Sequence, residues 1–109
     1  MTDERRRRER FEAENVFAAI TVVGGCDQGL GLITNVSEGG LCIRTPIPPP
    51  RFAKCVLKIN MDEEHHEVKA LVRRVEQAEG PYYDVGMQFA IRDPGRTRFI
   101  ESFLTRTEG

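Results

Sequence analysis

Apolar and polar side chains alternate along residues 52–61, and this alternation constrains the fold more than any other feature of the sequence. Cys55, Leu57, Ile59 and Met61 would face one side of the segment, while lysine and asparagine side chains would face the other. A period of two predicts a half-buried antiparallel strand. Two later segments repeat the period: Val68, Ala70 and Val72 in one, and Val85, Met87 and Phe89 in the other.

The first half of the chain adds three predicted strands. Residues 15–23 are rich in β-branched and aromatic side chains and end at two glycines, and a second strand is predicted over residues 29–34. The polar residues 35–40 form a turn before a strand over 41–45, which the following prolines terminate. Strands joined only by short turns imply an antiparallel barrel or sandwich.

The period changes at Asp93-Pro94, where aspartate can cap a helix and proline suits its first turn. Apolar residues then recur at helical spacing, at Phe99, Ile100, Phe103 and Leu104. We expect a C-terminal helix that docks this face against the strands. The predicted fold class is therefore all-β with a C-terminal helix.

Length and composition predict one soluble domain in the cytoplasm. The 109 residues, 30% of them charged, suit a single globular domain. No apolar run approaches the roughly 20 residues that span a bilayer, and no apolar core of a signal peptide follows the charged N-terminus.

Cys26, Cys42 and Cys55 are odd in number and widely spaced, with no clustered histidines to complete a zinc site. We interpret them as reduced, and we expect Cys42 and Cys55 to pack in the core as small apolar side chains. No metal site is predicted.

Positive charge is concentrated at the N-terminus. Residues 1–10 contain five arginines and three acidic residues, which gives this segment a net charge of +2. Because the whole chain has a net charge of −1, the remaining residues carry −3. Guanidinium groups bind phosphate through paired hydrogen bonds. The arginines alone are equally compatible with a solvated basic tail, or with nonspecific attraction to nucleic acid or anionic lipid.

The turn at residues 35–40 is the second candidate feature. Asn35 offers an amide, Ser37 a hydroxyl, and Gly39 and Gly40 allow a close approach of backbone to a flat polar ligand. These residue types are also the ones that ordinary turns favour, so the loop by itself leaves both interpretations open.

Together the two features resemble the bipartite signature of the PilZ domain family, RxxxR followed by (D/N)xSxxG. Arg6 and Arg10 are the only arginines of the cluster with the RxxxR spacing, and Asn35, Ser37 and Gly40 fill the second motif. The resemblance extends over essentially the whole chain, through the VGMQF segment to the predicted helix.

The resemblance implies a six-stranded antiparallel β-barrel over residues 15–109 that binds cyclic di-GMP, with an arginine-rich flexible arm over residues 1–14. Arg6 and Arg10 would bind phosphate and guanine. Asn35 and Ser37 would hydrogen-bond the guanine edge, and Gly40 would leave room for the ligand and permit the geometry of the turn.

Two further residues are candidates for contact with the ligand. Arg5 directly precedes the first motif, at a position thought in similar domains to influence whether one ligand or a stacked pair binds, and we expect the pair. Gly39 adjoins Gly40 in the loop. No cofactor is expected beyond the ligand.

The expected function is a bacterial second-messenger receptor whose arm orders on ligand binding and whose altered surface is read by a downstream protein. One alternative is a PilZ-like protein-interaction module without ligand binding. A nucleic-acid or membrane-surface binder is disfavoured by the negative remainder of the chain. Catalysis is disfavoured because His65 and His66 would point to opposite faces of a strand and no nucleophile accompanies them.

Overall fold

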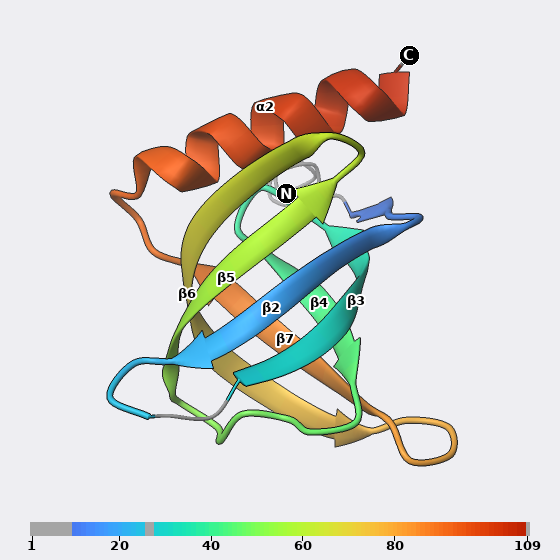
Figure 1. The fold of residues 1–109 in the computed structure, drawn as a ribbon, viewed down its shortest axis with the longest axis vertical. Coiled ribbons are helices and arrows are strands. Elements are labelled where there is room, and N and C mark those ends of the chain that lie inside the picture. The colour runs from blue at the N-terminus through green and yellow to red at the C-terminus, as the bar shows by residue number, and fades with distance from the viewer. Residues whose placement is uncertain (1–9, 26–27, 109) are drawn as a thin grey trace, which may run out of the picture.

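The computed structural model describes residues 10–25 and 28–108. These residues form seven strands and one helix, arranged as a barrel with the helix across one end (Figure 1). The elements are β1 (Phe11–Glu12), β2 (Val16–Val22), β3 (Gln28–Val36), β4 (Gly40–Thr45), β5 (Lys54–Met61), β6 (Glu64–Gln77), β7 (Tyr83–Phe89) and α2 (Pro94–Glu108).

Six of these strands close into an antiparallel barrel, which confirms the predicted fold. The strand order is β3-β2-β5-β6-β7-β4, and β4 pairs again with β3 to complete the circle. The two-residue strand β1 lies outside this circle and pairs with β3. Residues 11–12, which we expected in the flexible arm, are thus held against the barrel.

The core lies inside the barrel and follows the predicted alternation. Cys55, Leu57, Ile59 and Met61 are all at most 2% exposed. The apolar residues predicted on β6 and β7 are buried as well. Cys42 is also buried, at 6% exposure, as expected, although its neighbours Leu41 and Ile43 belong to the main core cluster and Cys42 does not.

Helix α2 closes one end of the barrel with the predicted apolar face. Phe99 and Phe103 are buried in the core cluster. Asp93 caps the helix as expected, since its Oδ1 accepts a bond of 3.2 Å from the N–H of Gly95. Its Oδ2 accepts a second bond, of 2.7 Å, from the N–H of Lys69 on β6. Over the described residues, no helix is long and apolar enough to cross a membrane.

Candidate functional site

A β-bulge near the end of β3 places Asn35. We expected residues 35–40 to form a turn, but β3 continues to Val36, and only residues 37–39 connect it to β4. The register with β4 shifts between Ile33 and Asn35, so Thr34 is the extra residue. Ile33 and Val36 can then both be buried although they are three residues apart, and the side chain of Asn35 is left partly exposed on the outer surface.

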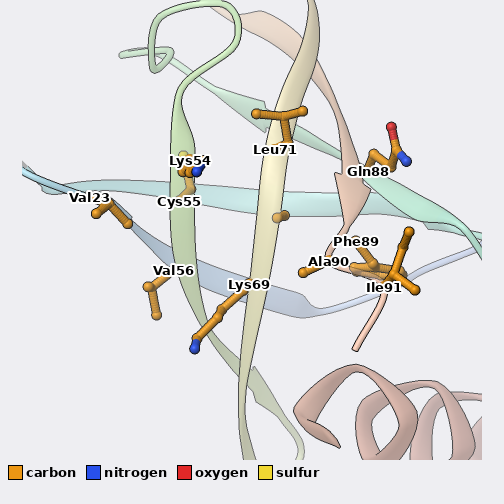
Figure 2. Close-up of a pocket in the computed structure, with 11 residues that line it drawn as sticks. Val23, Lys54, Cys55, Val56, Lys69, Leu71, Gln88, Phe89, Ala90 and Ile91 are labelled. Atoms are coloured by element: carbon orange, nitrogen blue, oxygen red, sulfur yellow. The ribbon is translucent and has the colours of Figure 1, made fainter. Parts of the chain in front are cut away.

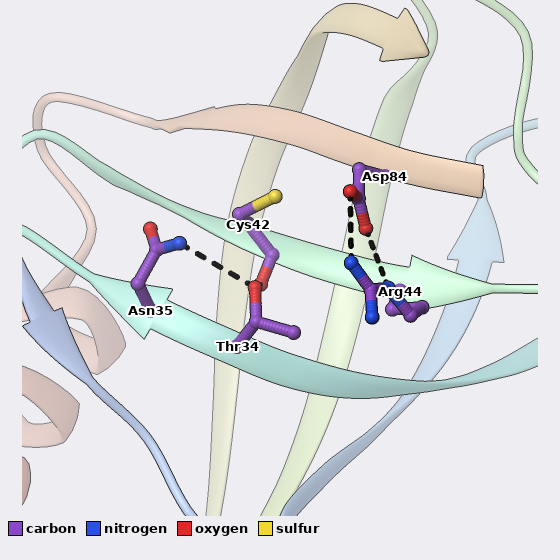
Figure 3. Close-up of polar contacts among 5 residues, drawn as sticks. All are labelled: Thr34, Asn35, Cys42, Arg44 and Asp84. Atoms are coloured by element: carbon purple, nitrogen blue, oxygen red, sulfur yellow. Dashed lines mark hydrogen bonds and ion pairs between the residues drawn. The ribbon is translucent and has the colours of Figure 1, made fainter. Parts of the chain in front are cut away.

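Arg10 of the first motif meets Asn35 of the second. Arg10 Nη1 donates a hydrogen bond of 2.9 Å to Asn35 Oδ1. Asn35 Nδ2 donates to Thr34 Oγ1 at 3.4 Å, and Thr34 Oγ1 donates to the carbonyl of Cys42 at 3.3 Å (Figure 3). The bulge residue therefore supports the amide that contacts Arg10. The positions of Arg5 and Arg6 lie outside the described residues.

Backbone pairing fixes the position of Arg10. In β1, Phe11 pairs with Val36 and Glu12 pairs with Asn35. The N–H of Ala13 donates to the carbonyl of Thr34 at 3.0 Å, which continues the attachment beyond the strand. The end of the first motif is thus tied to the strand that carries the start of the second.

The second-motif turn is closed by bonds between its first and last residues. The N–H of Ser37 donates to the carbonyl of Gly40 at 2.8 Å, and Ser37 Oγ lies 3.3 Å from the same oxygen. Gly40 does not have a positive φ. A Cβ there would instead collide with the carbonyl oxygen of Met87 on β7, whereas a Cβ at Gly39 would meet nothing within 4 Å. Glycine at position 40 therefore permits the close packing of β4 on β7.

A hollow of about 310 Å³ opens beside this turn. Arg10, Ser37, Gly39 and Gly40 line it on the motif side. The structure thus brings together, at one hollow, every predicted site residue that it describes except Asn35, and Asn35 is bonded to Arg10. Their contact with a ligand stays a prediction.

Two arginines that we did not predict also line the hollow. Arg73 and Arg74 lie on β6, next to Gly86 of β7. The register of β6 with β7 shifts between Val72 and Arg74, so Arg73 is the extra residue of a second bulge. The sequence holds a signal for this bulge, because Val72 and Val75 both pack in or against the core at a spacing of three rather than two.

A bidentate ion pair lies on the outer face near the hollow. Arg44 Nε and Nη2 donate to the two carboxylate oxygens of Asp84 at 2.9 and 3.1 Å (Figure 3). The hydrogen bond from Arg44 lowers the pKa of Asp84, and the same bond raises the pKa of Arg44. Each group therefore holds the other in its charged form.

A larger cavity, of about 490 Å³, lies along the outside of β5, β6 and β7 (Figure 2). Its lining is mostly apolar, with Val56, Leu71 and Ile91 among its side chains, and it also includes Lys54 and Lys69. None of the described motif residues, Arg10, Asn35, Ser37 and Gly40, lines it. Chemistry rather than size therefore identifies the smaller hollow as the candidate site.

The histidines have structural partners. His65 Nδ1 pairs with Asn60 Oδ1, and His66 Nε2 lies 3.0 Å from Glu64 Oε1. The hydrogen bond with His66 is the main cause of the lowered pKa of Glu64. Within residues 10–25 and 28–108, no group of three or more histidine, cysteine, aspartate or glutamate side chains could hold a metal ion.

Residues 4–105 of the chain match the family model described as PilZ domain. No curated protein matches the sequence.

Solved structures are similar over most of the chain. The PilZ domain with c-di-GMP of YcgR from Escherichia coli has a TM-score of 0.77 at 15% identity, over 95% of this chain and 92% of that one. The K. pneumonia MrkH complex with c-di-GMP has a TM-score of 0.72 at 23% identity, over 92% of this chain and 51% of that one. The Bacillus subtilis inhibitor of motility, MotI/DgrA, has a TM-score of 0.71 at 18% identity, over 94% and 51%. At these identities the similarity shows the fold, and the chain spans about half the length of MrkH and MotI.

Proposed function

Because the chain belongs to the PilZ domain family, we propose that it is a receptor for cyclic di-GMP and not an enzyme. The observation that carries this proposal is that Arg10, which lines the hollow together with Ser37 and Gly40, is hydrogen-bonded to Asn35. These residues come from the two signature motifs, which are separated by 24 residues of sequence between Arg10 and Asn35. Their convergence is what a bipartite ligand site requires.

The chemistry of the site suits the ligand. Cyclic di-GMP has two phosphates and two guanines, and arginine can pair with phosphate or with guanine O6 and N7. Arg6 and Arg10 would supply these contacts, while Asn35 and Ser37 would hydrogen-bond the guanine edge. Arg10 and Asn35 are exposed or partly exposed and bonded to each other, so the ligand would replace one solvent-accessible hydrogen bond.

We also propose that binding changes the conformation of the N-terminal arm. Arg10 is attached to the barrel through β1, and the ligand would draw Arg6 and Arg5 towards the same hollow by neutralising their charge. The altered surface would then bind a downstream protein. Hydrogen exchange of the arm, measured with and without cyclic di-GMP, tests this step: equal protection in both samples would contradict it.

The alternative is a protein-interaction module that binds no ligand. One observation favours it: Phe17 and Leu30 are 53% and 73% exposed on neighbouring strands β2 and β3, and Leu32, opposite Phe17, is 37% exposed. Exposed apolar clusters of this kind mark protein contacts. A receptor that signals to a partner would need such a surface as well, so ligand binding decides between the two functions.

Isothermal titration calorimetry with cyclic di-GMP tests the proposed function, with GTP and a linear dinucleotide as ligand controls. We expect selective binding by the wild type, and a loss of about ten- to a hundredfold in affinity for Arg10→Ala, because a charge-assisted contact contributes about 1.5 to 3 kcal/mol. Arg98→Ala, on the exposed face of α2, removes the same charge away from the hollow and should change little.

The stoichiometry of the same titration tests the predicted ligand pair, because two molecules per chain are expected if Arg5 supports stacking. No binding by the folded wild type would reject the receptor function and favour the interaction module.

A further inference from the structure

The hollow beside the second-motif turn carries more positive charge than the two signature motifs supply. Arg10 of the first motif lines it, and so do Arg73 and Arg74 of β6. No carboxylate is among the described residues that line it. Guanidinium groups that share a site repel one another, so an anionic ligand is their natural complement.

The acidic side chains near these arginines leave their charge largely available. Arg74 Nε lies 3.5 Å from Glu76 Oε2, but both side chains are about half exposed, and such pairs are weak. The carboxylate of Asp84 already accepts hydrogen bonds from Nε and Nη2 of Arg44. Among the residues that the structure describes, Arg73 has no ion-pair partner within 4.0 Å.

The guanidinium of Arg74 packs against Gly86 of β7. A Cβ at position 86 would lie 3.1 Å from both Cζ and Nη2 of Arg74 and 3.4 Å from Nη1. These nearly equal distances show that the guanidinium lies face-on over the Gly86 backbone. One face of the guanidinium thus covers Gly86 of β7, and the Arg74 side chain, which lines the hollow, is still 48% exposed.

We propose that the bulge of β6 is a third part of the cyclic di-GMP site, in which Arg74 stacks on a guanine base and Arg73 pairs with a phosphate. A planar guanidinium held flat on a surface loses little freedom when a purine stacks on it. Arg73 is brought to the same hollow because the bulge inserts it as an extra residue. This inference rests on the proposed function.

Calorimetric titration of the full chain with cyclic di-GMP tests the third part of the site. Arg74→Ala should weaken binding about tenfold, because a stacked guanidinium in a desolvated contact contributes on that scale. Arg74→Lys should bind the ligand nearly as weakly as Arg74→Ala, since lysine keeps the charge but has no planar group to stack on guanine. Gly86→Ala retains every charge and should still weaken binding, because the new Cβ displaces the guanidinium. Arg73→Ala should weaken binding by about three- to tenfold and lessen its salt dependence.

The controls separate this inference from the proposed function. Arg98→Ala should bind as the wild type does, and thermal melts should show every variant folded. The third part of the site would be overturned if Arg74→Ala and Arg74→Lys both bound within about twofold of the wild-type affinity while Arg10→Ala lost much of it. The receptor function would then remain intact. Absence of binding by the folded wild type would overturn both.

Discussion

The two sides of the barrel differ in how regularly their strands pair. On one side, β2 pairs with β5 over seven consecutive residues, and β5 pairs with β6 over eight, without a shift of register. On the other side, the β3–β4 and β6–β7 ladders each contain one bulge, and the regular β4–β7 ladder lies between them. The candidate site lies on the bulged side.

The difference shows how a small barrel combines stability with a site. Regular pairing directs alternate side chains inward, so β5 is the source of much of the core. A bulge interrupts this alternation and leaves two neighbouring polar side chains on the outer face. Thr34 and Asn35 at one bulge, and Arg73 and Arg74 at the other, are these pairs. Stability and binding should therefore respond to different substitutions.

The largest effect on stability is expected on the regular side. Leu57 of β5 is fully buried, and Leu57→Ala should lower the free energy of unfolding by about 2 to 5 kcal/mol through lost burial and the cavity that remains. Lys58→Ala, on the adjacent exposed position, should change it by less than about 0.5 kcal/mol. Urea denaturation measures both.

The same variants test the division between the two sides. The folded Leu57→Ala protein should bind cyclic di-GMP with nearly wild-type affinity. A marked loss of affinity would mean that the regular side also positions the ligand.

A smaller loss of stability is expected at Gly40, which both packs β4 on β7 and lines the candidate site. Gly40→Ala would place a Cβ against the carbonyl of Met87, and the required shift of β4 should cost about 1 to 3 kcal/mol. Gly39→Ala is the matched control, because a Cβ there has open space. Thermal unfolding of the two variants compares them directly, and equal stability would show that β4 can move away from β7 without cost.

The strands on both sides of the barrel were predictable from the sequence, whereas the two bulges were not predicted, for a physical reason. The alternation along residues 52–61 determines which side chains point inward, since the apolar face of the strand must be buried. A bulge depends on the partner strand, so residues 35–40 were interpreted as a turn although Asn35 and Val36 belong to β3. The motifs identified Arg10 and Asn35 as candidates, but Arg73 and Arg74 carry no motif and resemble ordinary surface charges until β7 is placed beside them.

The smallest predicted effect concerns the ion pair between Arg44 and Asp84, which lies between the two bulged ladders. The hydrogen bond from Arg44 lowers the pKa of Asp84 in the folded protein, whereas an unfolded aspartate has a pKa of about 3.9. A lowered folded-state pKa gives stability that is fully present above the unfolded value and is lost as the pH falls through the folded value. Asp84→Asn should therefore be slightly less stable than the wild type at pH 7, and the difference should shrink below about pH 4.

Urea midpoints of wild type and Asp84→Asn, measured from pH 7 to pH 3, test this expectation, with Glu101→Gln on the exposed face of α2 as the control. A difference that stays constant over this range would mean that the geometry of the hydrogen bonds, and not the charge of Asp84, makes the contribution. The effect should be small because both side chains are partly exposed, at 42% and 29%, and water screens such pairs. A large effect would contradict the division between the two sides, since it would place a main source of stability in the polar outer face between the bulges.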